Sequence, residues 1–139
     1  KKCFEELILQ KIDLKGIILK PNMILPGTTS DEKISSEKIA ELTLKCLKDS
    51  VPNEVPGIAF LSGGQSEEQA TENLNMINVK NNSDIKMTFS YGRALQQSAL
   101  KYWSKNQDDI EGTKKIFNHR ANMCTLAAKG KWKKELEKK

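Results

Sequence analysis

The stretch from Gly16 to Met23 limits the possible folds more than any other part of the chain; its sequence is Gly-Ile-Ile-Leu-Lys-Pro-Asn-Met. Three large aliphatic residues without polar alternation predict a buried strand of a parallel sheet, in which both faces are covered. Pro21 ends regular pairing, because proline has no backbone N–H and keeps the preceding residue extended. The sequence therefore predicts that Lys20 lies at the carboxyl end of a buried strand.

This pattern alone gives Lys20 two interpretations. Enzymes built on α/β barrels place their reactive groups at the carboxyl ends of the strands. A lysine amine in apolar surroundings loses solvation, and the resulting fall in pKa makes such an amine a nucleophile. A lysine at a strand end can equally be a surface residue, with its stem on apolar side chains and its head in water. Lys20 is the candidate catalytic amine, and the surface interpretation stays open beside it.

The unit of strand followed by helix is repeated along the chain. We expect strands at residues 14–20, 57–61 and 86–90, and helices at 2–11, from about 35, from 66, after 92 and at 109–128. Alternating strands and helices predict an α/β fold with parallel strands and helices outside them. Three parallel strands do not close a barrel, and open edges tend to pair with other chains. We therefore expect the folded context to include further strands.

The helical segments carry caps and apolar faces. The sequence Ser66-Glu67-Glu68-Gln69 is a capping box, and a serine near residue 35 predicts another N-cap. Apolar residues at helical spacing predict the buried faces. The expected buried residues are Ile39, Leu42 and Cys46; Ala70, Leu74 and Ile77; Leu95, Ala99 and Tyr102; and Ile110, Phe117, Ala121 and Cys124.

Two glycine-containing loops follow the second and third strands. In a parallel sheet these loops lie next to each other at the carboxyl edge, where barrel enzymes often bind phosphate. Glycines let backbone N–H groups approach an anion, and Arg93 at the start of a helix adds a fixed positive charge. Each feature has a plain structural alternative, namely an ordinary turn, a helix cap or a surface arginine. The candidate phosphate-binding residues are Ser62, Gly63, Gly64, Ser90, Gly92 and Arg93.

Composition excludes several classes of function. The net charge of +5 could indicate nucleic-acid binding, but the basic residues cluster only in 129–134. We interpret residues 129–139 as a solvated, partly disordered basic tail, and expect neither a nucleic-acid partner nor a membrane partner. Three widely spaced cysteines indicate free thiols in a reducing compartment such as the cytosol. The single histidine, His119, is interpreted as a surface residue without metal-ligand spacing.

Three blocks of sequence carry a resemblance to a known family: Leu-Lys-Pro-Asn-Met at 19–23, Phe-Leu-Ser-Gly-Gly-Gln-Ser-Glu-Glu at 60–68 and Phe-Ser-Tyr-Gly-Arg-Ala-Leu-Gln at 89–96. Together they resemble the class I fructose-1,6-bisphosphate aldolases, which form a Schiff base and need no metal. The resemblance runs from about residue 14 to 131. It implies part of a TIM (β/α)8 barrel, roughly its last three strands with their helices and a C-terminal helix. We expect residues 1–139 to be a carboxyl-terminal fragment of that single domain.

The resemblance also implies an activity and a set of roles. Lys20 matches the Schiff-base lysine, and the six loop residues match the substrate-phosphate site. The implied reaction is reversible cleavage of fructose 1,6-bisphosphate, or of fructose 1-phosphate, by a cytosolic glycolytic lyase without a cofactor. The general acid–base residues belong to the earlier strands, so this chain alone is expected to hold an incomplete active site. Full-length members also end in a tyrosine and form homotetramers, whereas this chain ends in Lys138 and Lys139.

Two alternatives remain beside this interpretation. The first is a non-catalytic interaction module, because the resemblance also implies binding to cytoskeletal proteins and to adhesin tails. The second is another Schiff-base barrel enzyme, such as a transaldolase or a deoxyribose-phosphate aldolase. Those enzymes lack the set of three blocks, so this second alternative has little support.

Overall fold

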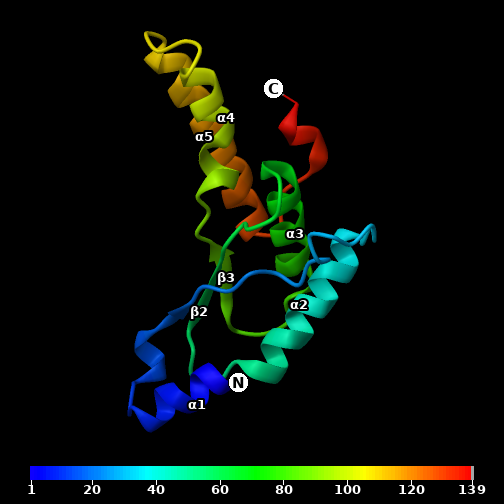
Figure 1. The fold of residues 1–139 in the computed structure, drawn as a ribbon, viewed down its shortest axis with the longest axis vertical. Helices are drawn as coiled ribbons and strands as arrows, with labels where there is room; N and C mark the ends of the chain where they lie inside the picture. Colours follow the sequence, from blue (N-terminus) through cyan, green and yellow to red (C-terminus); the bar gives the residue numbers. More distant parts are fainter. Residues whose placement is uncertain (139) are drawn as a thin grey trace.

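A computed structural model describes residues 1–138 and shows parallel strands flanked by helices (Figure 1). The helices are α1 (Lys2–Leu9), α2 (Ser36–Ser50), α3 (Glu67–Lys80), α4 (Arg93–Trp103) and α5 (Ile110–Ala128), with 3-10 helices at Leu14–Gly16 and Lys134–Glu137. The strands are β1 (Ile18–Leu19), β2 (Gly57–Phe60) and β3 (Lys86–Phe89). They form one three-stranded sheet in the order β1-β2-β3, and both pairings are parallel.

The register of the sheet separates a covered face from a more open one. Leu19, Ile58 and Met87 stand opposite one another in the ladder. Ile58 and Met87 are buried, whereas Ile18 of the edge strand is 69% exposed. Strands β2 and β3 therefore alternate between the two faces. The prediction that the first strand is buried on both faces is wrong for Ile18, because β1 is an edge strand among the described residues.

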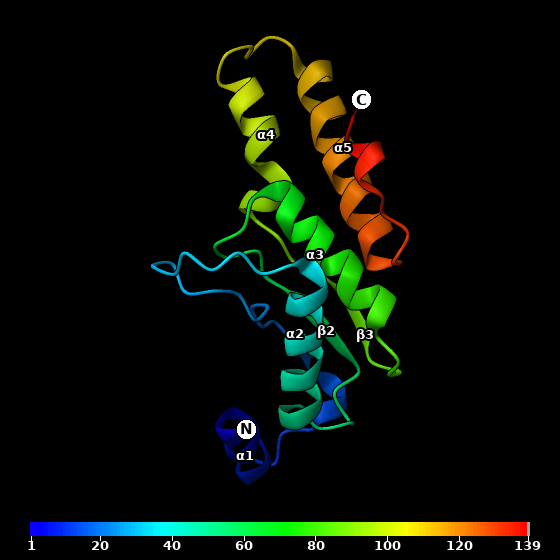
Figure 2. The same ribbon diagram turned by 90° about the vertical axis from the view of Figure 1, so that its right-hand side faces the viewer.

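The helices form a continuous layer. Helix α2 packs against α3, α3 against α5, and α5 against α4. Figure 2 shows α2 and α3 next to each other in front of β2 and β3. Residues Ala70, Leu74 and Ile77 of α3 are fully buried, as predicted. Burying a leucine or isoleucine side chain stabilises a fold by about 1.5–3 kcal/mol, so this face of α3 contributes strongly to the core.

Local signals at the helix ends are confirmed. The Ser66 side chain accepts a hydrogen bond from the Gln69 N–H, and the Gln69 side chain accepts one from the Ser66 N–H. The Ser35 side chain accepts from the Lys38 N–H and caps α2. These two caps satisfy N–H groups that have no partner within their helices.

Several predicted buried positions differ in the structure. In α2, Cys46 is exposed, while Thr43 and Leu47 are buried. The buried row of α2 follows residues 39, 43 and 47, which lie about one helical turn apart on the same face. In α5, Ile110 and Phe117 are exposed, because the first turns of this helix extend with α4 beyond the sheet (Figure 1). The predicted first strand is also shorter, since residues 14–16 form a 3-10 helix.

The basic tail is packed against the fold through Trp132 and Glu137, while the lysine side chains of residues 129–138 are exposed. Trp132 is only 8% exposed, and its backbone N–H donates to Asn75 Oδ1 at 2.9 Å. Glu137 accepts two hydrogen bonds from Arg120, at 2.6 and 2.8 Å. The prediction of a partly disordered tail is therefore wrong for residues 131–138, whereas the predicted solvation is confirmed for the tail lysines among them, which are exposed. Residue 139 lies outside the described residues.

Candidate active site

Lys20 lies directly after β1, at the predicted edge of the sheet. The pairing of the backbone continues beyond it, because the Leu61 N–H donates to Pro21 O at 3.0 Å. Extending the register by one residue places Lys20 opposite Ala59, on the open face of the sheet. The Lys20 side chain is exposed in this structure. The apolar surroundings predicted for the amine are therefore not supplied by the described residues.

The same edge holds both predicted phosphate loops. The Ser90 N–H donates to Phe60 O at 2.8 Å, so the second and third strands end side by side. Ser62, Gly63 and Gly64 follow β2, and Ser90, Gly92 and Arg93 follow β3 or begin α4. The sheet thus brings all seven predicted site residues to one edge. Parallel strands whose ends coincide produce this clustering.

The loop after β2 is a tight turn, which we define as Ser62–Gln65 and name the phosphate loop after its predicted role. The Gln65 N–H donates to Ser62 O at 3.1 Å. Gly64 has a φ of 79°, the left-handed value that a type II turn requires at its third residue. A Cβ atom at Gly63 would lie 3.0 Å from Leu61 Cδ1. The backbone conformation therefore requires glycine at Gly64, whereas at Gly63 an added Cβ would only crowd a leucine side chain, and the anion-binding role of both stays a prediction.

Replacing Gly64 with alanine is expected to destabilise the chain by about 1–2 kcal/mol, because a left-handed φ strains an L-residue with a Cβ atom. Urea unfolding measures this change. Gly16→Ala is the matched control, since an added Cβ there meets nothing within 4 Å and Gly16 has no positive φ. Equal stability of the Gly64→Ala chain and the wild type would contradict the turn geometry.

The loop after β3 leads straight into α4. Gly92 is the N-cap residue, and its carbonyl accepts from the N–H groups of Leu95 and Gln96. Among residues 1–138, no side chain caps this helix, which begins at the exposed Arg93 next to the site edge. The positive end of a helix dipole favours an anion at this position.

Tyr91 anchors this second loop to the core, a role that the sequence did not reveal. Its hydroxyl donates to Ala70 O at 2.9 Å, and its ring lies 5.4 Å from the ring of Phe89. Burial raises the pKa of the Tyr91 hydroxyl far above its ordinary value, so this group stays protonated. Tyr91 therefore links the loop after β3 to α3, the helix that follows the phosphate loop.

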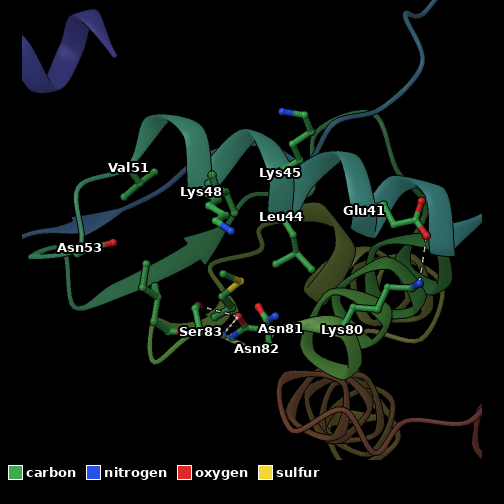
Figure 3. A pocket seen from close by; sticks show the side chains of 13 residues that line it. Glu41, Leu44, Lys45, Lys48, Val51, Asn53, Lys80, Asn81, Asn82 and Ser83 are labelled. Atoms are coloured by element: carbon green, nitrogen blue, oxygen red, sulfur yellow. Dashed lines mark hydrogen bonds and ion pairs between the residues drawn. The ribbon is translucent and has the colours of Figure 1, made fainter.

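Two clefts lie near the ends of the strands. One, of about 760 Å³, is bordered by the loop after β1 and by the phosphate loop, including Asn22, Gly63 and Gln65. The other, of about 790 Å³, lies at the opposite ends of the strands, between α2 and the segment that enters β3 (Figure 3). There the Lys80 ammonium pairs with Glu41 at 3.2 Å. None of the seven predicted site residues lines that second cleft.

His119 is half-buried rather than a surface residue. Its Nε2 lies 3.7 Å from Glu137 Oε2, because the tail folds back over α5. Within residues 1–138, no three His, Cys, Asp or Glu side chains lie close enough together to hold a metal ion. Over the same residues, no helix combines the length and apolar character needed to cross a bilayer.

Comparison with known proteins identifies the family. The sequence model for fructose-bisphosphate aldolase class I, a glycolytic family, matches residues 1–139. The chain belongs to the class I fructose-bisphosphate aldolases. It is 46% identical over 132 residues to cytosolic fructose-bisphosphate aldolase 4 of Arabidopsis thaliana, covering 94% of this chain and 34% of that protein. It is 44% identical to the cytoplasmic isozyme of Spinacia oleracea, covering 94% of this chain and 36% of that one.

A solved aldolase structure confirms the predicted fold. It is the fructose-bisphosphate aldolase of Plasmodium falciparum in complex with TRAP and a small-molecule inhibitor, 40% identical to this chain. The two structures superpose with a TM-score of 0.89 over 94% of this chain and 38% of the other. The three parallel strands and their helices therefore correspond to part of the aldolase barrel. The chain spans between about a third and two fifths of the length of these relatives.

Proposed function

We propose that residues 1–139 supply the Schiff-base lysine and the phosphate-binding loops of a glycolytic class I fructose-bisphosphate aldolase. The observation that carries this proposal is the position of Lys20, which directly follows β1 at the edge shared with Ser62–Gly64 and Ser90–Arg93. Membership of the aldolase family supports the assignment.

The proposed reaction begins with attack of the neutral Lys20 amine on the ketone carbon of fructose 1,6-bisphosphate. Loss of water gives a protonated imine, which draws the electrons of the C3–C4 bond toward nitrogen. A base takes the proton of the C4 hydroxyl as that bond breaks, and glyceraldehyde 3-phosphate is released, or glyceraldehyde when the substrate is fructose 1-phosphate. The remaining enamine takes up a proton, and water hydrolyses the imine to dihydroxyacetone phosphate and the free amine.

The loops hold the substrate during these steps. The backbone N–H groups at Gly63, Gly64 and Gly92 approach a phosphate group, and Arg93 donates to its oxygens. Such contacts fix the ketone carbon beside the amine and lower the entropic cost of the attack. The desolvation and proton transfers come from groups outside the described residues, because Lys20 is exposed here. The chain alone is thus an incomplete site.

Borohydride trapping with dihydroxyacetone phosphate, followed by peptide mass mapping, tests the proposal. Two samples are compared: the chain itself, and the chain fused behind the part of the Plasmodium falciparum aldolase that precedes the matched region. We expect a stable adduct on Lys20 in the fusion, and a much slower one in the chain alone because its amine is solvated. Trapping on another lysine, or on none in either sample, overturns the mechanism.

We propose partner binding as a second function, supported by the Plasmodium falciparum relative that was solved in complex with TRAP. Lys20 separates the two functions, because replacing it removes imine formation and leaves surface contacts intact. Measured affinity for a TRAP peptide should therefore be unchanged in a Lys20→Met fusion. We also propose a cytoplasmic location, which the cytosolic relatives support, and a homotetramer for the complete protein, which family membership supports.

A further inference from the structure

The core helix α3 carries a buried amide that points to the phosphate loop. Asn73 is only 5% exposed. Its Nδ2 donates to Gln65 Oε1 at 2.8 Å. A buried amide destabilises a fold unless it is hydrogen-bonded, so this bond fixes the position of both side chains.

Gln65 is the last residue of the phosphate loop. Its backbone N–H closes the turn on Ser62 O at 3.1 Å, and its side chain is bound to α3 through Asn73. The Nε2 atom of Gln65 is buried and has no partner among the described residues. The bond from Asn73 is therefore the side-chain contact that holds this end of the turn against the helix.

The Gly63 end of the turn contacts the segment that follows Lys20. Asn22 Nδ2 lies 3.5 Å from Gly63 O, and Asn22 Oδ1 accepts from the Met23 N–H at 2.9 Å. This contact is long and exposed, so it restrains the loop weakly. The conformation of Gly63 and Gly64 thus depends mainly on the anchor at Gln65.

We propose that Asn73 is a positioning residue, which keeps the phosphate loop in its anion-binding conformation by holding Gln65. This inference rests on the proposed function, because it assigns Asn73 to the same phosphate site. Loss of the Asn73 amide frees Gln65, and the turn that contains Gly63 and Gly64 then loses its fixed conformation. Phosphate binds less tightly as a result.

Asn75 provides a matched control on the same helix. It is also buried, and its Oδ1 accepts from the Trp132 N–H at 2.9 Å. This contact leads to the tail and not to the phosphate loop. Asn73→Ala and Asn75→Ala therefore each remove one buried amide from α3. Only Asn73→Ala removes a hydrogen bond to the phosphate loop.

The test is a titration of the 15N-labelled chain with inorganic phosphate, followed by NMR at the amides of Gly63 and Gly64. We expect Asn73→Ala to weaken phosphate binding about 10-fold, within the range of one buried hydrogen bond, and to move both glycine signals before phosphate is added. Asn75→Ala should lower the melting temperature similarly and leave the glycine signals and the affinity unchanged. Equal affinity in the wild type and Asn73→Ala overturns this inference alone.

Gln65→Met removes the same hydrogen bond by changing its acceptor in the loop. It leaves the buried Asn73 side chain in place, so no cavity forms beside α3. It should weaken phosphate binding as much as Asn73→Ala does, and the double variant should be no weaker than either single one. Additive losses would show that the two residues act separately and would overturn the inference. A wild-type chain whose glycine signals ignore phosphate would overturn the phosphate site and this inference together.

Discussion

Replacing Lys20 with methionine is expected to abolish the borohydride-trapped adduct in the fusion protein, along with cleavage of fructose 1,6-bisphosphate. Methionine keeps much of the apolar stem but has no amine to form the imine. The sugar phosphate should still bind, because the phosphate loop and Arg93 are unchanged. Mass mapping measures the adduct, a coupled assay measures cleavage, and calorimetric titration with inorganic phosphate measures binding without requiring activity.

Lys33→Met is the matched control for this experiment. Lys33 is exposed and lines the cleft beside the phosphate loop, but it does not follow a strand. Its replacement removes one positive charge close to the site and should leave the adduct on Lys20. Loss of phosphate binding in Lys20→Met would contradict the division of roles, since Lys20 would then bind phosphate instead of the ketone carbon.

The clustering of the seven candidate residues at one edge of the sheet could be predicted from sequence, because it depends on where the strands end. In a parallel sheet, the residues after each strand meet at one edge whatever the details of packing. The aliphatic run before Lys20 and the glycines after Phe60 and Ser90 mark those ends locally. The capping box at Ser66 was equally visible, because its two hydrogen bonds join residues three apart.

The hydrogen bonds that hold the two loops in place could not be predicted, because they join residues on different elements of the fold. Tyr91 donates to a carbonyl 21 residues away, and Asn73 reaches the phosphate loop across eight residues. Neither contact follows a helical or strand period, so no local pattern marks it. The exposure of Lys20 has the same origin, because β1 is an edge strand among the described residues and the burial of a strand depends on what packs against it.

In the tail, a contact between residues far apart in the sequence produces packing that the amino-acid composition does not predict. Arg120 and Glu137 lie 17 residues apart, and their side chains are only 6% and 8% exposed. Arg120 also donates to Thr71 of α3, and Trp132 Nε1 donates to Glu137 Oε1. A lysine-rich segment with one tryptophan resembles a solvated end in composition. The buried pair instead binds this segment to α3 and α5.

Replacing Glu137 with alanine is expected to destabilise the chain by about 3–5 kcal/mol, because the Arg120 guanidinium would stay buried without its partner. Urea unfolding measures the loss, and the fluorescence of Trp132 reports release of the tail in a Trp103→Phe background. Glu135→Ala is the matched control, since Glu135 lies in the same segment and is exposed. A double change to methionine at 120 and 137 should recover most of the stability, because no charge remains buried.

The effect of Glu137 should also depend on pH. Burial raises the pKa of this carboxyl, but hydrogen bonds from Arg120 and Trp132 outweigh it and hold the pKa below the ordinary value. A carboxyl with a depressed pKa stabilises the fold fully above its unfolded pKa of about 4.3, and this stabilisation is lost as the pH falls through the folded pKa. The difference in the free energy of unfolding between wild type and Glu137→Ala should therefore be constant at neutral pH and shrink in acid. A difference that widened in acid would show that the carboxyl is protonated in the fold, and the tail would then be held by packing of Trp132 instead of by the ion pair.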